Sequence, residues 1–148
     1  MRDPLYLDFN ATTPIHPQVA DAMRPWLDRG FGNPSSGHPY GRRARAAVDH
    51  AREQLAGLLG CAPSDVIFTG GGTESNNLAI QGVARARRDA GRHLITSTVE
   101  HPAVGEVMGH LAARGYEVQR VSVDATARVD PDAVIAAVRD DTQLISLM

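Results

Sequence analysis

Three consecutive glycines, Gly70 to Gly72, stand directly before Thr73 and a stretch with the apolar spacing of a helix. The preceding residues 66–69, VIFT, are β-branched and aromatic, which predicts a short strand. Glycines between a strand and a helix expose backbone N–H groups at the positive end of the helix dipole. Phosphate is the usual anion bound there, because no β-carbon keeps it away from the backbone. Thr73 would cap the helix or donate its hydroxyl to a phosphate oxygen.

The glycine stretch also fits a simpler interpretation. No Gly-Lys-Ser/Thr follows it, which excludes a Walker A loop, and it lacks the G-x-G-x-x-G spacing of a dinucleotide site. On position and composition alone, a phosphate-binding turn and a turn whose glycines only relieve backbone strain are equally good interpretations.

His101 is the second residue whose type suggests chemistry. Its imidazole offers a flat π surface and can exchange protons near neutral pH. The residue also stands directly before Pro102 at an expected helix start, so a purely structural capping role is the alternative. The other histidines have no spacing typical of metal ligands, and we expect no metal site.

Composition limits the classes of function. The chain has 148 residues, of which 43% are apolar and 22% charged, as in ordinary globular domains. Its net charge of −2 argues against binding to nucleic acid or acidic membranes, and no apolar run is long enough to cross a bilayer. The single cysteine, Cys61, fits a reducing compartment, so we expect a cytoplasmic protein. The chain has no lysine, so chemistry that needs a side-chain primary amine is closed to it alone.

The elements that must position these residues fall into two parts, of which the first is helical. Residues 1–15 are expected to form an extended arm, and residues 31–39, rich in Gly, Pro, Asn and Ser, a loop. Apolar side chains recur at helical spacing in residues 16–30, where Pro25 would disturb the middle of the helix. The same spacing predicts a longer helix in residues 40–60, with a glycine as its end.

Strands and helices alternate in the rest of the chain. The expected strands cover residues 66–69, 93–97, 116–123 and 142–148, and the expected helices residues 73–90, 101–115 and 130–139. This order is typical of an α/β fold with a doubly wound, mostly parallel sheet and helices on both faces. A buried central strand is an unusual place for a domain to stop, so we expect the domain to be truncated after Met148.

Four segments in the same order resemble one family. IFTGGGTESNNLAI (67–80) resembles the phosphate-binding turn of the fold-type I pyridoxal 5′-phosphate (PLP) enzymes, in particular the NifS/IscS-like cysteine desulfurases of the class V aminotransferase group. YLDFNATTP (6–14) resembles their N-terminal arm, and FGNPSSGH (31–38) their loop entering the active site. TSTVEHPAV (96–104) resembles the segment that carries a histidine over the cofactor.

The resemblance implies the PLP-dependent transferase-like fold, which is that of aspartate aminotransferase, but only its N-terminal portion. Residues 1–15 would be the arm, and residues 16–60 a helical segment that contains the active-site loop 31–39. Residues 61–148 would form the first half of the PLP-binding large domain, which is therefore incomplete.

The resemblance also assigns roles to individual residues. Gly72 and Thr73 match the pair that binds the cofactor phosphate, and His101 matches the catalytic histidine that stacks on the cofactor ring. Asn10 and Ala11 of the arm, and Asn33 of the loop, would approach the substrate, although all three also suit turns without any ligand.

The reaction implied by the family converts L-cysteine to L-alanine and passes the sulfur to an acceptor or scaffold protein, and family members are homodimers. The lysine that holds the cofactor and the cysteine that takes the sulfur would lie outside this chain. Cys61 comes too early to be that cysteine and is expected to be a small buried residue at a helix end. The chain alone should therefore be inactive. A related enzyme such as a selenocysteine lyase, or a short non-catalytic binding module, is the alternative.

Overall fold

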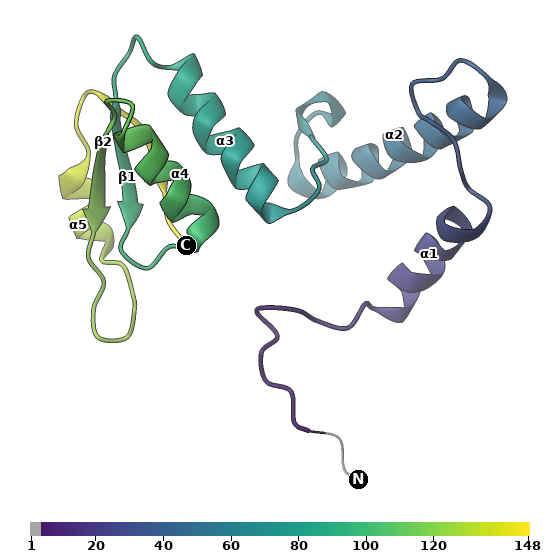
Figure 1. Ribbon diagram of the computed structural model, residues 1–148, viewed down its shortest axis with the longest axis horizontal. Coiled ribbons are helices and arrows are strands. Elements are labelled where there is room, and N and C mark those ends of the chain that lie inside the picture. Colours follow the sequence, from purple (N-terminus) through teal and green to yellow (C-terminus); the bar gives the residue numbers. More distant parts are fainter. Residues whose placement is uncertain (1–3) are drawn as a thin grey trace. The chain divides into compact units, whose positions relative to one another are not determined.

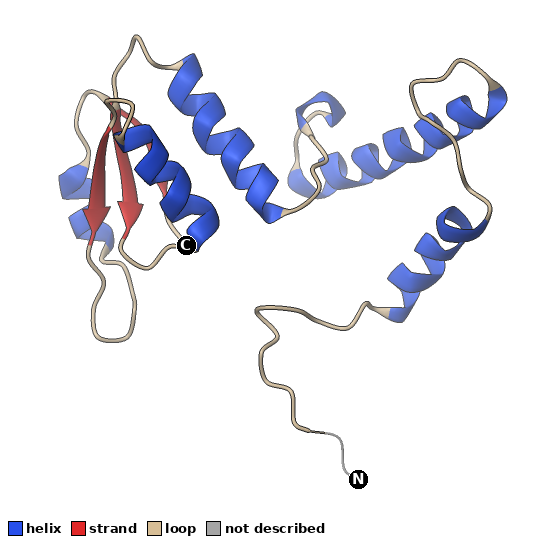
Figure 2. Ribbon diagram, viewed as in Figure 1, coloured by secondary structure: helices blue, strands red, loops and turns tan. Residues whose placement is uncertain are grey.

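The computed structural model describes residues 4–148, and the chain divides into two compact units between residues 67 and 68. Figure 1 traces the chain through both units, and Figure 2 marks their helices and strands. The predicted boundary at residues 60 and 61 lies close to this division. Each unit is described by itself.

In its described residues, the first unit contains helices and loops but no strand. The helices are α1 (Pro17–Asp28), α2 (Pro39–Leu59) and a short 3-10 helix η1 (Pro63–Asp65). The prediction that Pro25 disturbs the middle of α1 is wrong, because the helix continues to Asp28 and the N–H of Arg29 donates to the Pro25 carbonyl at 3.0 Å. Pro25 lies in the last third of the helix. Its missing N–H removes one backbone hydrogen bond there and does not end the helix.

The loop before α2 folds against the start of that helix. A β-carbon at Gly41 would collide with the carbonyl oxygens of Asn33 and Ser36, so only glycine allows this close approach. At its other end α2 stops at Gly60, which adopts a left-handed conformation with φ 70°. The following residue, Cys61, is exposed, so its predicted burial is wrong. Few of the described side chains of this unit are buried.

The second unit is a parallel α/β layer structure, as predicted. In chain order it contains α3 (Gly72–Ala86), β1 (His93–Ser97), α4 (Pro102–Ala112), β2 (Glu117–Val121), α5 (Pro131–Ala137) and β3 (Thr142–Ser146). The strands form one sheet in the order β2-β1-β3, and both pairings are parallel (Figure 2). No helix of the described residues is long and apolar enough to span a membrane.

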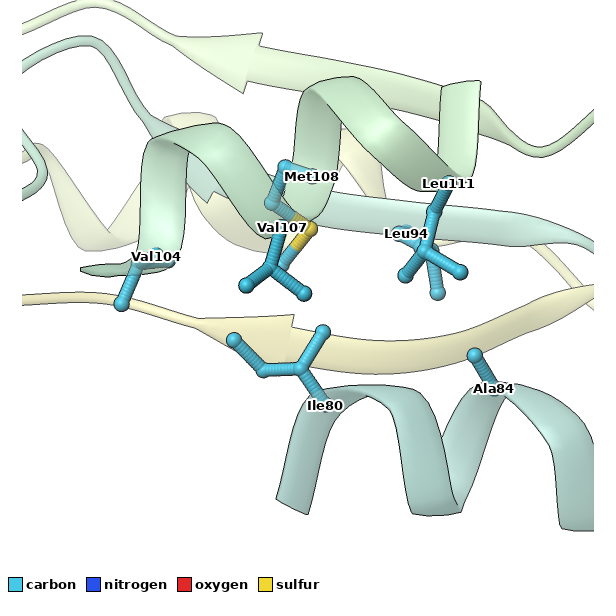
Figure 3. Close-up of a cluster of buried hydrophobic side chains, with 7 residues drawn as sticks. All are labelled: Ile80, Ala84, Leu94, Val104, Val107, Met108 and Leu111. Carbon is cyan, nitrogen blue, oxygen red and sulfur yellow. The ribbon is translucent and has the colours of Figure 1, made fainter. Parts of the chain in front are cut away.

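Helices cover both faces of this sheet. Because β2 and β3 lie on opposite sides of β1, and crossovers between parallel strands are right-handed, α4 and α5 must pack on opposite faces. The neighbouring residues Leu94 and Ile95 of β1 accordingly point to different cores. One core joins β1 to α3 and α4 through the residues drawn in Figure 3: Ile80, Ala84, Leu94, Val104, Val107, Met108 and Leu111. The other core joins Ile95 and Val121 to Val134 and Ala137 of α5.

Two predictions for this unit need correction. Residues 66–69 belong to no strand, because they pair with none of the three strands of the sheet in the described residues. The helix predicted for residues 73–90 ends at Ala86 and is followed by turns. The helix α5 is capped by Asp130, whose carboxylate accepts a hydrogen bond from the N–H of Asp132 at 3.0 Å.

Candidate functional site

The glycine corner, residues 70–73, begins α3 with its backbone donors open. Gly71 is the N-cap residue and has no side chain to offer, so Thr73 is not the cap of this helix. None of the hydrogen bonds among the described residues uses the N–H groups of Gly71, Gly72 or Thr73, or the Thr73 hydroxyl. Four donors therefore remain at the positive end of a 15-residue helix.

Polar side chains of the first turn hold this corner in shape. The Glu74 carboxylate accepts the N–H of Gly70 at 2.6 Å, which satisfies that donor and leaves the next three free. The Thr69 hydroxyl donates to the Gly71 carbonyl at 3.1 Å and accepts from the Ser75 hydroxyl at 2.6 Å. Sequence reasoning predicted none of these hydrogen bonds, and the six-residue spacing of Thr69 and Ser75 is not a recognised capping pattern.

Gly71 and Gly72 are glycines for different physical reasons. Gly71 has φ 157° and ψ 177°, a conformation that only glycine adopts readily. Gly72 is helical, and a β-carbon there would meet no protein atom within 4 Å. Neither backbone conformation nor packing therefore explains glycine at position 72. Open space beside free N–H groups is what an approaching anion needs.

His101 is the N-cap residue of α4. Its Nδ1 accepts a hydrogen bond from the N–H of Ala103 at 3.0 Å, and Pro102 occupies the first helical position. The capping role considered for this residue is therefore real. It does not exclude a second role, because the ring faces and Nε2 take part in no hydrogen bond or ring contact among the described residues.

A groove of about 510 Å³ between α3 and α4 brings Thr73 and His101 together. Both helices pack on the same face of the sheet, with Ile80 of α3 against the α4 side chains that include Val107 (Figure 3). Beyond the two helix starts, the groove is lined by the polar side chains of Asn77, Gln81, Glu106 and His110. The arrangement provides anion-binding donors at one point and an imidazole nearby.

The other residues predicted to contact a ligand lie in the first unit and use turn geometry. The side-chain oxygen of Asn33 accepts the N–H of Ser35 at 2.9 Å. The N–H of Ala11 donates to the Asp8 carbonyl at 3.1 Å, and Asn10 lies in the same exposed turn. Their contacts with a substrate stay predictions. In the part of the chain described, no group of three or more His, Cys, Asp or Glu side chains is arranged to hold a metal ion.

The carboxyl edge of the sheet carries a carboxylate that sequence reasoning did not single out. Glu100 accepts hydrogen bonds from the Ser97 hydroxyl at 2.5 Å and from the N–H of Met148 at 2.9 Å. Ser97 is buried at the end of β1, and Met148 follows β3. The bridge joins the ends of two neighbouring strands directly before His101, and so supports the loop that positions the imidazole.

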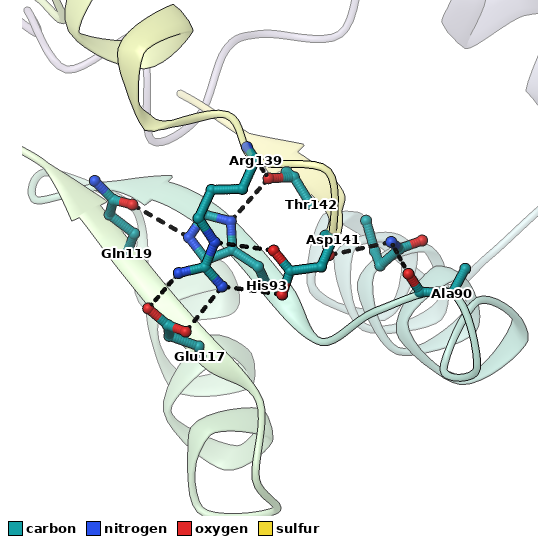
Figure 4. Close-up of polar contacts among 8 residues, drawn as sticks. Ala90, His93, Glu117, Gln119, Arg139, Asp141 and Thr142 are labelled. Carbon is teal, nitrogen blue, oxygen red and sulfur yellow. Dashed lines mark hydrogen bonds and ion pairs between the residues drawn. The ribbon is translucent and has the colours of Figure 1, made fainter.

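The opposite, amino edge of the sheet holds a separate polar network (Figure 4). Arg139 binds both carboxylate oxygens of Glu117, at 2.6 and 2.8 Å, and also contacts Asp141. These hydrogen bonds to Arg139 lower the pKa of both carboxyl groups and raise the pKa of the guanidinium. The ring of buried His93 forms hydrogen bonds with the hydroxyl of Thr142 and with the side chain of Gln119 in β2. Because His93, Glu117 and Thr142 begin the three strands, this network is structural and lies away from the groove.

The chain is similar to one family model and to several known proteins. A family model described as aminotransferase class-V matches residues 5–148. The chain is 49% identical over 148 residues to a cysteine desulfurase IscS of Dictyoglomus turgidum, an alignment that covers 100% of this chain and 38% of that protein. A solved structure named NifS-like protein matches with a TM-score of 0.88 and 37% identity, covering 95% of this chain and 39% of the other. A structure described as SspA in complex with cysteine matches with a TM-score of 0.86 and 39% identity, covering 96% and 41%.

The chain thus spans well under half the length of the relatives and solved chains that it matches. The family match nevertheless runs through both units and includes the glycine corner and His101. On that evidence the chain belongs to the class V aminotransferase family.

Proposed function

We propose that the protein carrying this chain is a PLP-dependent cysteine desulfurase, to which the chain contributes the N-terminal arm and the first half of the cofactor domain. The observation that carries the proposal is the groove shared by Thr73 and His101, with unpaired N–H groups at its α3 end. The similarity to proteins named cysteine desulfurase IscS supports the same activity.

The residues present fit the cofactor's phosphate. The N–H groups of Gly71 to Thr73 and the Thr73 hydroxyl would bind its oxygens, and the free space at Gly72 lets the group approach. The exposed ring of His101 would lie against the cofactor's pyridine ring. Bound there, the cofactor supplies an electron sink for the charge that develops on an amino-acid substrate.

The substrate we propose is L-cysteine. Its carbon–sulfur bond breaks, the sulfur bonds to a cysteine thiolate of the enzyme as a persulfide, and the remaining carbon skeleton takes up a proton to become L-alanine. A solved structure similar to this chain is described as a complex with cysteine, which supports this choice. Because the chain has no lysine to hold the cofactor covalently, we propose that these 148 residues alone are inactive.

The proposal extends to partners and location. The sulfur would pass to an acceptor or scaffold protein for iron–sulfur cluster or thio-cofactor assembly. We propose a homodimer in the cytoplasm: the single cysteine suits a reducing compartment. Many large apolar side chains of the first unit are exposed, which suits a surface that other protein covers. They include Leu5, Leu7, Ile15, Leu27, Phe31, Leu58 and Leu59.

Turnover by the full-length protein tests the proposal. The purified protein should show the visible absorbance of bound PLP and should form alanine and sulfide from L-cysteine in the presence of a thiol. A parallel assay with L-selenocysteine separates a desulfurase from a selenocysteine lyase, which would act on the selenium compound alone. Absence of bound cofactor, or of alanine, would contradict the assignment.

A further inference from the structure

The hydrogen bonding of His101 limits what its ring can do, an inference that rests on the proposed function. Three helices of this chain begin with a His-Pro pair, and in each the Nδ1 atom of the histidine accepts a backbone N–H. The donor–acceptor distances are 3.3 Å for His16, 3.3 Å for His38 and 3.0 Å for His101. Only His101 of the three lines the groove.

Accepting this bond determines which nitrogen carries the hydrogen. A neutral imidazole has one N–H and one nitrogen lone pair, and the lone pair must be on Nδ1 if Nδ1 accepts from Ala103. The hydrogen is therefore on Nε2. Pro102 strengthens this arrangement because its ring holds the first helical residue in the backbone conformation that the cap requires.

The capping bond occupies the Nδ1 lone pair, so Nδ1 is not available to a ligand while α4 keeps its cap. The other ionisable groups near the ring are Glu100, which is bound to Ser97 and Met148, and the groove residues Glu106 and His110. The groove residues of α3 are all uncharged.

We infer that His101 donates a hydrogen bond to the bound ligand through Nε2–H, while Nδ1 serves only as the cap of α4. His101 combines two functions that the sequence presented as alternatives, since the capping bond is what fixes the tautomer that faces the groove.

Nitrogen-15 NMR of the ligand-free, full-length protein tests the tautomer directly. Histidine is labelled in the ring, and the His101 signals are identified as those missing from the His101→Asn variant. At a pH where the ring is neutral, we expect a single tautomer with the hydrogen on Nε2. A hydrogen on Nδ1, or equal populations of the two tautomers, would overturn the inference. His110, which lies in the last turn of the same helix and caps no helix start, serves as the uncapped control.

Two substitutions test the donor role in the cofactor-loaded enzyme. Asparagine places an oxygen near the Nδ1 position and keeps the cap, whereas glutamine places an amide N–H near Nε2 and keeps the donor. We expect His101→Gln to retain roughly tenfold more turnover than His101→Asn, as one hydrogen bond to the ligand predicts. Equal losses in the two variants, with both folded by circular dichroism, would contradict a donor role. Failure of the unsubstituted protein to bind PLP would contradict the proposed function while leaving the NMR result in force.

Discussion

Thr73 and His101 line one groove although they begin different helices that are separated in the chain by the whole of β1. Their proximity results from α3 and α4 packing on the same face of the sheet, through a core that contains Ile80 and Val107. Each helix start contributes something different: open N–H groups from α3 and a capped imidazole from α4. The two contributions can be tested separately.

Replacement of Thr73 by valine should weaken PLP binding roughly tenfold to a hundredfold, since one hydrogen bond to a charged oxygen is lost while the side-chain shape is kept. Thr73→Ser keeps the hydroxyl and should bind nearly as well as the natural protein. Cofactor titration followed by absorbance measures both affinities. Equal binding by the valine and serine variants would show that the hydroxyl does not contact the phosphate.

Gly72→Ala should separate folding from binding. The added methyl group meets no protein atom and the position is helical, so the free energy of unfolding should stay constant or rise by about 0.5 kcal/mol. PLP affinity should fall about tenfold, because the methyl group takes up the space through which the phosphate approaches. Denaturant unfolding of the ligand-free protein and cofactor titration measure the two effects.

Gly71→Ala is the matched variant and should behave differently. Its φ of 157° is unfavourable for any residue with a β-carbon, so the ligand-free protein should lose about 1–3 kcal/mol of stability. If Gly71→Ala were as stable as Gly72→Ala, the backbone conformation described for Gly71 in the glycine corner would be incorrect.

The cap of α4 should contribute measurably to stability. His101→Ala removes the acceptor for the N–H of Ala103 and should lower the free energy of unfolding by about 1 kcal/mol, whereas His101→Asn should preserve it. His110→Ala, at an exposed position on the same helix, controls for the loss of an imidazole. Thermal unfolding without cofactor measures all three, and a neutral effect of His101→Ala would contradict the capping bond.

The Arg139 network predicts how stability responds to acid. Hydrogen bonds from Arg139 lower the folded-state pKa of Glu117 and Asp141, whose ordinary values are 4.5 and 3.8. The stabilisation is therefore complete above those ordinary values and is lost as the pH falls through the lower folded-state values, because the unfolded chain takes up protons first. Both groups are at the surface, so the effect should be small.

Glu117→Gln isolates the contribution of that pair. The variant should be less stable than the natural protein at pH 7, and the difference should shrink as the pH falls below about 4.5. Thermal unfolding midpoints of both proteins between neutral and acidic pH provide the measurement. A difference that stays constant over this range would show that ionisation of Glu117 does not contribute.

Local chemistry made several elements predictable. His-Pro and Asp-Pro pairs begin four of the helices in the described part of the chain, and Gly60 ends α2 in a left-handed conformation, because capping depends on neighbours in the sequence. The strand at 93–97 was predictable because its apolar run is short and flanked by polar turns. The exposure of Cys61 and the absence of a strand at residues 66–69 were not, since both depend on what packs or pairs from elsewhere.

By itself, the sequence determined that this chain forms a parallel α/β unit with glycines at a helix start, because periodicity, helix capping and backbone freedom are properties of neighbouring residues. Only the tertiary structure decided that Thr73 and His101 share a groove, and that Glu100, directly before His101, joins the ends of β1 and β3. The order of the strands and the face on which each helix packs determine which of these side chains lie close together. They follow from burial of apolar side chains far apart in the chain, such as Ile80 against Met108, which no local pattern specifies.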